Sequence, residues 1–406
     1  MTESRVELPN PFDLNAYTWT IMSLAQTVDS GHVVLDFSRC TRAYPDGVLP
    51  LIATVNRMRS EGRDIEVVPP TAKNLAGVFQ GVGWTQYLVE GESTFLDLSA
   101  QTRKFTPARP FRTGAELDVL RESILHVALT QGKLAEWLPE AIQWTLWEVM
   151  ENVLNHAQSE CGWVQASTFS ERRHINFVVV DSGIGIRASL AGLEGGLDDQ
   201  RAIKRAVEEG VTRDPNSNAG FGLTGCRAIT ADNRGQMVVY SGSSLMRQEF
   251  LSASRPELRR YTPVLGPHQG TIVELQLRMD RPVDLEKALG QKRPVTILEL
   301  EHDVEGEFVF TVADEAANLG TRESGRQIRN KVRNLTQVED ERVAIDFSGV
   351  EMVSSSFADE FVAKLAAEVG RDAFYRRYVL RGMNSSVKAI VLPTLWLRLE
   401  GSRSAG

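Results

Sequence analysis

The amino-acid sequence predicts an α/β (α+β) protein in three parts, a central α/β sandwich between two small α/β domains. Two observations predict this architecture. The two ends of the chain resemble each other, and each alternates short β-rich runs with amphipathic helices. The middle of the chain has a different order of predicted elements, because two helical stretches precede a series of strands and a glycine-rich segment. We therefore expect domains at 1–102, 103–290 and 293–398.

The repeat at the two ends centres on the tripeptide Asp-Phe-Ser, at residues 36–38 and 346–348. In both copies it ends a short apolar run and is followed, after a polar turn, by apolar residues at helical spacing. These residues are Leu49, Ile52 and Val55 in the first copy and Phe357, Phe361 and Leu365 in the second. A further β-rich run follows at 65–68 and at 378–380. This order predicts a small α/β domain at each end.

Stretches with proline and basic residues separate the middle of the chain from its ends. Residues 103–112 hold two prolines and four basic residues, and residues 291–294 read Gln-Lys-Arg-Pro. Such composition is typical of linkers. Between them we expect helices at 114–131, at 138–156 and from Leu223, and strands at 162–168, 175–180, 237–240 and 271–277.

The overall composition excludes several classes of protein. With a formal net charge of −8, the chain is not expected to bind nucleic acid through its overall charge. The 42% hydrophobic and 24% charged residues are ordinary for a globular protein and argue against disorder.

The cysteines and the N-terminal residues indicate the cellular compartment in which the protein is expected. Cys40, Cys161 and Cys226 are odd in number and far apart, which favours neither a disulfide framework nor a zinc site. The first residues are polar where a signal peptide would be basic and then apolar, and no apolar run approaches the roughly 18 residues of a membrane span. We expect a cytoplasmic protein without a membrane partner.

Three short patterns in the middle of the chain suggest chemistry. Glu148 and Asn152 lie four residues apart on a predicted helix, hence on one face. An apolar strand runs directly into Asp181-Ser-Gly-Ile-Gly, where glycines allow a tight turn and a close approach of a ligand. Residues 218–225 form a glycine-rich loop that opens a helix, an arrangement that suits phosphate binding. Each pattern alone is weak, but in this order they predict a nucleotide site.

The arrangement resembles the GHKL (Bergerat-fold) ATP-binding family of gyrases, heat-shock chaperones, mismatch-repair proteins and histidine kinases. The resemblance implies that the chain binds ATP and Mg²⁺. Asn152 matches the asparagine that holds Mg²⁺, and Glu148 matches the acid that orients or deprotonates the attacking hydroxyl or water. Asp181 matches the acceptor of the adenine amino group, and Thr271 matches a threonine near the adenine.

The resemblance also assigns roles to the glycines and to the segment between them. Gly183 and Gly185 match the first glycine box, and Gly220, Gly222 and Gly225 match the second, which wraps the triphosphate. Residues 186–219 would then be a mobile ATP lid. Lys204, Arg205 or Arg213 could reach the γ-phosphate, although a solvated charge is the favoured interpretation of each. His156 could support the site or simply end its helix.

The two ends resemble STAS-like domains, the fold of anti-sigma-factor antagonists, and the C-terminal one resembles the STAS-like domains of unknown function that bacteria often fuse to GHKL ATPases. Counted from Asp-Phe-Ser, the family's phosphorylatable serine corresponds to Ser355 at the C-terminal end and to Pro45 at the N-terminal end. Only Ser355 is then a possible phosphoacceptor. Residues 354–356 could equally cap the helix that follows, since serine is a favoured N-cap.

Three functions are compatible with these patterns. The first is a Mg·ATP-dependent regulatory ATPase or switch of bacterial signalling or defence, with a protein partner or a second copy bound through the STAS-like domains. The second is an anti-sigma-type protein-serine kinase that acts on a STAS domain, and the third is a non-catalytic nucleotide-sensing scaffold. A sensor histidine kinase is less favoured, because His126 lacks the proline-containing acceptor motif. A gyrase or mismatch-repair role would need a transducer domain after the ATP site.

Overall fold

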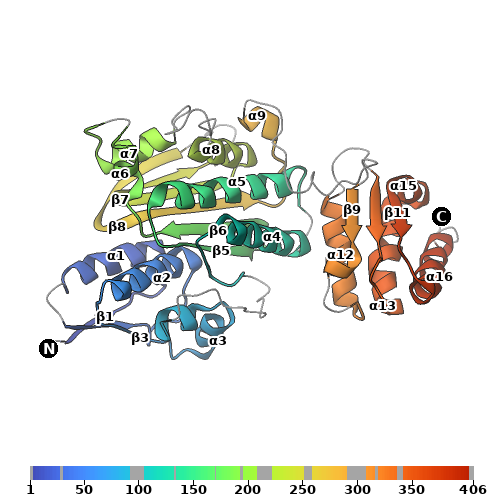
Figure 1. Cartoon of the computed structure of the whole chain (residues 1–406), viewed down its shortest axis with the longest axis horizontal. Coiled ribbons are helices and arrows are strands. Elements are labelled where there is room, and N and C mark those ends of the chain that lie inside the picture. The colour runs from blue at the N-terminus through green and yellow to red at the C-terminus, as the bar shows by residue number, and fades with distance from the viewer. Residues whose placement is uncertain are drawn as a thin grey trace. The chain divides into compact units, whose positions relative to one another are not determined.

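The computed structural model describes residues 3–27, 31–91, 105–131, 134–169, 171–192, 195–207, 222–250, 258–289, 308–315, 319–335 and 342–401. The chain forms two compact units. The first comprises Met1–Ile124, Trp144–Met279 and Asp284–Lys292, and the second comprises Leu125–Gln143, Asp280–Val283 and Arg293–Gly406. Helices and strands alternate in both, so the α/β class is confirmed (Figure 1).

The N-terminal part of the first unit is a three-stranded parallel sheet with helices between the strands. The sheet has the order β1-β2-β3. Its elements are β1 (Glu3–Glu7), α1 (Leu14–Ala25), β2 (His32–Asp36), α2 (Pro45–Ser60), β3 (Ile65–Val68) and α3 (Lys73–Gly81). Helix α2 begins with Pro45 at its first position, where a missing N–H costs nothing.

The central part of this unit is a five-stranded antiparallel sheet of order β4-β5-β6-β8-β7. Its strands are β4 (Arg109–Phe111), β5 (Gly162–Phe169), β6 (His174–Asp181), β7 (Gln236–Glu249) and β8 (Leu258–Arg278). The predicted linker at 103–112 therefore contributes an edge strand. Pro110 fits there because an edge strand leaves one side without ladder bonds, and the ring of the fully buried Phe111 fills the space beside Gly162.

Helices cover one face of this sheet and the N-terminal part covers the other (Figure 1). Helix α8 (Gly222–Asn233) lies on the first face, together with the Trp144–Asn152 portion of α5 (Leu138–Asn152). On the second face, Val178 and Val180 of β6 belong to the same buried cluster as α1 and α2. Because side chains alternate along a strand, the next residue, Asp181, points to the helix-covered face.

The N-terminal part and the central sheet share one hydrophobic core rather than meeting at a thin contact. Ile52 and Val55 of α2, fully buried, lie in one cluster with Trp163 and Ile272 of the central sheet. The indole Nε1 of Trp84 also donates to Gln165 Oε1 of β5 at 2.9 Å. The predicted boundary at residue 102 therefore lies inside one compact unit, and the predicted boundary at 291–294 lies outside the described residues.

The second unit contains a three-stranded parallel sheet of order β11-β10-β9. The strands are β9 (Phe308–Thr311), β10 (Val343–Asp346) and β11 (Tyr378–Arg381). The helices around it are α11 (Val312–Glu315), α12 (Arg322–Leu335), α13 (Ser355–Ala358), α14 (Lys364–Val369), α15 (Arg371–Arg377) and α16 (Ser385–Gly401). A π-helical turn, η3 (Asp359–Ala363), joins α13 to α14.

The internal repeat is visible as a shared turn geometry. Asp36 Oδ1 accepts from the backbone N–H of Ser38 at 2.7 Å, and Asp346 Oδ1 accepts from that of Ser348 at 2.8 Å. Each second carboxylate oxygen pairs with an arginine of a neighbouring strand, Arg5 at 2.6 Å or Arg381 at 3.1 Å. Asp-Phe-Ser therefore ends the middle strand of both small sheets in the same way.

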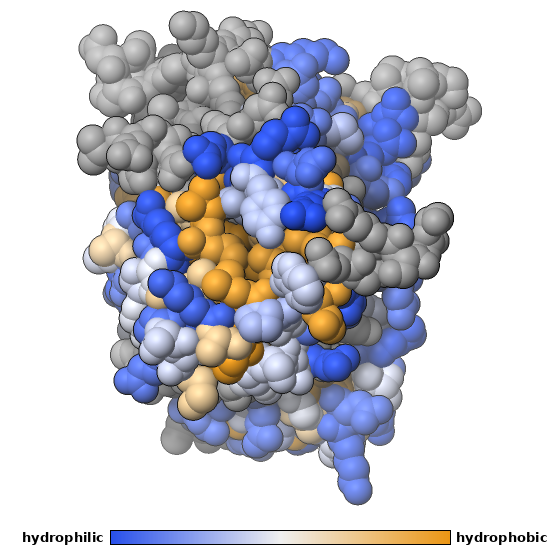
Figure 2. Space-filling view, turned by 90° about the vertical axis from the view of Figure 1, so that its right-hand side faces the viewer, coloured by the Kyte–Doolittle hydropathy of each residue, from blue (hydrophilic) through white to orange (hydrophobic). Residues whose placement is uncertain are grey.

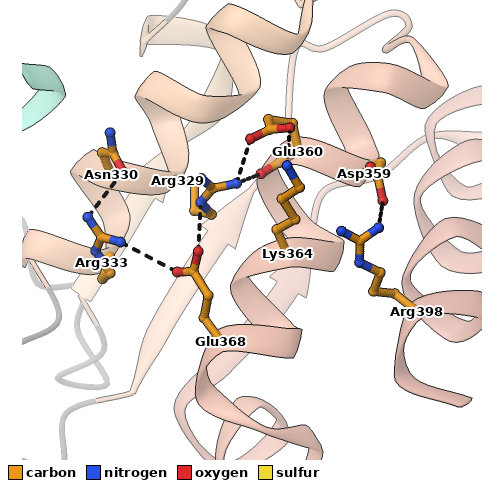
Figure 3. A network of polar contacts seen from close by, with 8 residues as sticks. All are labelled: Arg329, Asn330, Arg333, Asp359, Glu360, Lys364, Glu368 and Arg398. Carbon is orange, nitrogen blue, oxygen red and sulfur yellow. Dashed lines mark hydrogen bonds and ion pairs between the residues drawn. The ribbon is translucent and has the colours of Figure 1, made fainter. Parts of the chain in front are cut away.

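Ion pairs attach α12 to the helix that begins at α13 (Figure 3). Arg329 Nη1 lies 2.9 Å from Glu360 Oε1, with both side chains largely buried, and Arg329 Nε lies 3.3 Å from Glu368 Oε1. Lys364 Nζ lies 2.6 Å from the other carboxylate oxygen of Glu360, Oε2. Because the charges are paired and hydrogen-bonded, loss of one partner would leave an uncompensated buried charge.

Helix α16 carries apolar residues on two faces. On one face, the side chains of α16 are buried in the hydrophobic core of the second unit; they are Val387, Val391, Leu395 and Leu399. Leu392 and Trp396, four residues apart on one outer face, are exposed by 45% and 61%, and Leu397, farther round the helix, is exposed by 73%. Figure 2, which looks at the molecule from the side of α16, shows apolar side chains gathered on that face. Within the described part of the chain, no helix has both the length and the apolar character required to cross a bilayer.

Candidate functional site

Helix α5 places Glu148 and Asn152 on one face by burying another. Ile142, Leu146 and Val149 are almost fully buried, as the sequence predicts, and this fixes the rotation of the helix. After Asn152 the helix widens into the π-helical turn η2 (Val153–Ala157). Such turns occur frequently at functional sites. His156 lies in this turn and is partly buried, and its supporting role stays a prediction.

Glu148 and Asn152 both face the start of α8. A Cβ added to Gly222 would lie 3.5 Å from Asn152 Nδ2 and 3.7 Å from Glu148 Oε2. The acid, the carboxamide and a helix N-terminus are thus brought together, as the sequence predicts. A side chain at Gly222 would occupy the space between them, which explains the need for glycine there.

The environment of Glu148 suits a general base. Burial, and secondarily the carboxylate of Glu151, raise the pKa of Glu148 to about 7. Removal of water disfavours the charged form, and a like charge one helical turn away adds to this. A carboxylate with a pKa near neutral pH can accept a proton far more effectively than an ordinary glutamate.

The loop after β6 rests on the carboxyl end of the same helix. The backbone N–H of Ile184 donates to Ala157 O at 2.8 Å, and a Cβ on Gly183 would collide with that same carbonyl oxygen. Gly185 has φ +74°, a conformation that favours glycine. These two glycines therefore allow the Asp181 loop to lie close to Ala157, five residues beyond Asn152.

Asp181 is buried at the end of β6, with 3% of its surface exposed. Burial raises its pKa to about 7, although backbone N–H groups of Gly183 and Thr271 oppose this shift. Gly183 N–H donates to Asp181 Oδ1 at 2.8 Å, which fixes the carboxyl group. The carboxyl group is thus held in a fixed orientation at the end of β6.

Ser241 of β7 is a site residue that sequence reasoning missed. Its Oγ accepts from the backbone N–H of Ile186 at 3.0 Å and donates to Gly270 O at 2.8 Å. It thereby ties the first glycine box to the β8 segment that leads into Thr271, its own partner in the ladder. A serine inside a strand gives no signal in the sequence, since its role depends on a contact 55 residues away.

The remaining predicted glycines are placed differently. Gly225 lies in α8, where a Cβ would collide with the ring of Trp144, so the structure gives it a packing role between α8 and α5. Gly220 lies outside the described residues. The phosphate-binding role of both stays a prediction.

Where the structure describes it, the predicted lid at 186–219 includes most of α6 (Gly185–Leu190) and all of α7 (Asp199–Ala206). Helix α7 buries Ala202 and Ile203 and attaches to β7, because Asp199 Oδ2 accepts from the N–H and the hydroxyl of Ser243 at 2.8 and 2.7 Å. Its Lys204 is exposed, whereas Arg205 is half-buried. Arg213 and the segment 208–219 lie outside the described residues.

The donor set is compatible with Mg²⁺. Asn152 and Glu148 offer hard oxygen atoms, which Mg²⁺ prefers, and Mg²⁺ commonly takes few protein ligands beside phosphates and water. Among the residues that the structure describes, no group of three or more His, Cys, Asp or Glu side chains could hold a metal ion. A metal at Asn152 would thus depend on oxygen atoms of the nucleotide as well.

In the second unit, the serine cluster starts a helix. Ser354 Oγ accepts from the backbone N–H of Phe357 at 3.0 Å, so the capping interpretation is confirmed for this residue. Ser355 is the first residue of α13 and is exposed. It occupies the position that Pro45 holds in α2.

Comparison with known families agrees with this geometry. Residues 138–281 match the family described as histidine kinase-, DNA gyrase B-, and HSP90-like ATPase, and residues 324–388 match a STAS-like domain of unknown function. A search of curated proteins finds no match. The chain thus contains a GHKL-type ATPase domain and a C-terminal STAS-like domain, while the STAS-like character of the N-terminal part stays a prediction.

Proposed function

We propose that this chain, whose residues 138–281 form a GHKL-type ATPase domain, is a Mg·ATP-dependent regulatory ATPase of bacterial signalling or defence that works in the cytoplasm. The observation that carries the proposal is the meeting of Glu148 and Asn152 at Gly222, beside the N-terminus of α8. The STAS-like domain at 324–388 supports a regulatory role, because it joins a second module to the ATPase in one chain.

The residues of the chain divide the work. Asp181 accepts a hydrogen bond from the amino group of adenine. The N–H groups at the start of α8 bind phosphate. Asn152 would hold Mg²⁺, which neutralises phosphate charge when bound. Glu148, with its pKa near neutral, takes the proton of the attacking water or hydroxyl. Phosphoryl transfer needs positioning and charge neutralisation more than covalent chemistry, so one oriented base is sufficient.

A second candidate is a protein-serine kinase of the anti-sigma type. The observation that favours it is the exposed Ser355 at the first position of α13, in a domain matched as STAS-like. A phosphate there would add about 1.5 to 2 negative charges at a helix N-terminus, where the helix dipole tolerates them. Asp359 and Glu360 lie on the following turn, and Glu360 is neutralised by Arg329 and Lys364.

One experiment separates these functions. Purified full-length protein is incubated with γ-labelled ATP and Mg²⁺, alone and with candidate partners, and the label is followed to free phosphate or to protein. Free phosphate indicates the ATPase, and label on peptide 354–356 indicates the kinase. ATP binding with neither product would leave a nucleotide-sensing scaffold and contradict the proposed turnover.

Matched variants connect the activity to the site. Glu148→Gln should abolish most turnover, whereas Glu151→Gln, one helical turn away with its side chain bonded to Asn155, should retain it. Equal loss in both variants would show that the charge of this helix end, and not a base at position 148, matters.

The proposed partner is a second copy of this chain, bound through α16. Leu392 and Trp396 form an exposed apolar stripe at the i, i+4 spacing, with the exposed Leu397 beside it, and a twofold axis would set this stripe against its own copy. Light scattering should report a dimer that Trp396→Asp converts to monomer, with Tyr375→Asp, an exposed aromatic of α15, as control. A monomeric wild type would overturn this partner, and dimers in both variants would exclude the α16 stripe.

A further inference from the structure

A chain of hydrogen bonds runs from the N-terminal helices to the backbone of Asp181. Tyr17 of α1 is fully buried, and its Oη lies 2.9 Å from Thr54 Oγ1 of α2 and 2.6 Å from His268 Nδ1 of β8. On the other side of the ring, His268 Nε2 lies 3.0 Å from Asp181 O. Four residues from four elements are therefore connected across the interface between the N-terminal part and the central sheet.

The chemistry of the groups fixes the direction of each bond. A backbone carbonyl can only accept, so His268 Nε2 carries the ring hydrogen and donates it to Asp181 O. The other ring nitrogen then accepts from the Tyr17 hydroxyl, whose own oxygen accepts from Thr54. Burial lowers the pKa of His268 to about 4, and burial also raises the pKa of Tyr17, so both groups are uncharged at neutral pH. The chain has one consistent hydrogen-bond pattern.

The backbone around Asp181 explains why a side chain is needed there. The ladder between β6 and β8 ends at the pair Val180 and Ile272. At Gly270 the β8 backbone has φ +104°, and a Cβ there would collide with Asp181 O. The strand thus leaves the ladder beside that carbonyl, and His268 supplies a donor to it. A buried carbonyl without a donor would be costly.

We infer that Tyr17 and His268 are positioning residues through which the N-terminal part of the chain holds Asp181 in the orientation that reads adenine. This inference rests on the proposed nucleotide site. The hydrogen bond to Asp181 O fixes its peptide plane and hence the direction of its Cα–Cβ bond, while the carboxyl group itself points to the opposite, helix-covered face. The N-terminal part thus acts on the base-reading residue without touching the nucleotide.

The test measures the affinities of full-length protein for ATP and GTP by calorimetry. Guanine has a carbonyl oxygen at C6, where adenine has the amino group that donates to Asp181, so only ATP binding should depend on this orientation. Tyr17→Phe, which removes one hydrogen bond from the chain, should weaken ATP binding about 3- to 10-fold and leave GTP binding unchanged. Thr54→Val should act in the same direction but more weakly.

Two controls separate positioning from general damage. Thr20→Val removes another fully buried hydroxyl of α1, which donates to Ala16 O of the same helix at 2.8 Å, and should leave both affinities unchanged. His268→Gln keeps an N–H donor and should retain more ATP affinity than His268→Leu. Thermal unfolding of each nucleotide-free variant shows that it is folded.

The outcomes distinguish this inference from the function on which it rests. A wild-type protein that binds ATP, together with an unchanged ratio of ATP to GTP affinity in folded Tyr17→Phe and His268→Leu, would overturn the positioning role alone. A wild-type protein that binds no ATP would overturn the proposed function, and this inference with it.

Discussion

At the scale of single residues, the site combines two carboxyl groups with raised pKa values but different surroundings. Asp181 is enclosed, and backbone N–H groups from Gly183 and Thr271 hold it. Glu148 is only partly buried and faces the start of α8. Enclosure and fixed bonds suit recognition of a base, whereas access and a near-neutral pKa suit proton transfer. The two proposed roles therefore match the two environments.

Replacing Glu148 tests its role as base. We expect Glu148→Ala to lower turnover about 10²- to 10⁴-fold with little change in ATP affinity, because a general base acts mainly in the transition state. In the wild type, kcat/KM should rise with pH through a midpoint near 7, since only the deprotonated form accepts a proton. Steady-state kinetics between pH 5.5 and 8.5 measure both. A profile that is flat from pH 6 to 8 would contradict the assignment.

Asp181→Asn tests adenine recognition. Asn keeps an oxygen for the N–H of Gly183 but places an amide donor toward the adenine amino group. A lost bond to a charged acceptor is worth roughly 1.5 to 3 kcal/mol, which corresponds to about 10- to 100-fold weaker ATP binding. Calorimetry measures the ATP affinity of both proteins. An Asp181→Asn variant with unchanged ATP affinity would show that Asp181 does not bind adenine.

A pair of carboxyl groups at the interface between α2 and the central sheet predicts a pH-dependent stability. Burial, with Asp46 and Glu274 facing each other, raises the pKa of both, while Asn176 and Arg247 oppose the shift at Glu274 and Asp13 adds to it at Asp46. The unfolded chain loses these protons near pH 4, and the folded chain holds them to higher pH. Unfolding therefore releases protons in this window, so stability falls as pH rises through it.

Asp46→Asn should remove part of the fall in folding stability that accompanies rising pH. At pH 8 we expect the variant to be more stable than the wild type by on the order of 1 kcal/mol, and at pH 4 to be about equal. Thermal unfolding across this range measures the difference. Glu3→Gln, at an exposed position of β1, serves as the control for a surface charge change. A variant that is less stable than the wild type at pH 8 would show that the charged carboxylate stabilises the interface.

At the scale of elements, periodicity predicted the helices and strands with strong patterns. Helices α4 (Gly114–Gln131) and α5, and strands β5, β6 and β11, lie within a few residues of the predicted bounds. Strand β4 was missed because prolines and basic residues gave it the composition of a linker, whereas its pairing with β5 and the burial of Phe111 decide its structure. Such partners are distant in sequence and leave no local signal.

Helix α7 illustrates the limit of the lid prediction. Asp199 connects it to Ser243 of β7 and forms an ion pair with Arg187 at 3.2 Å. Asp199→Ala should therefore accelerate hydrogen exchange in α7 by about tenfold, because charge-assisted bonds to the strand are lost. A non-hydrolysable ATP analogue should restore part of the protection if the helix belongs to a lid.

The neighbouring residue offers a matched control. Asp198 caps α7 by accepting from Arg201 N–H, and Asp198→Asn keeps an oxygen for that bond while making the same change of charge. Exchange in α7 should stay close to that of the wild type. An equal effect of both variants, with no response to the analogue, would indicate a structural insertion rather than a lid.

At the scale of the whole molecule, sequence comparison of the two ends predicted a repeat, and their shared Asp-Phe-Ser turns agree with it. What the repeat could not predict is the different surroundings of the copies. In the first unit, the apolar face of α2 joins the core of the central sheet. Tyr17 and His268 carried no signal either, because the sequence contains no pattern that connects residues 251 positions apart.

That shared core constrains how the chain can be made. Ribosomes add roughly 5 to 20 residues per second, so between about 13 and 50 s separate the synthesis of Tyr17 from that of its partner His268. Until β6 and β8 have been synthesised, the α1 and α2 surfaces that will meet Val180 and Ile272 lack these partners. A nascent chain stalled before β8 should therefore be a target for chaperones and proteases, and a fragment that ends at residue 102 should aggregate on release.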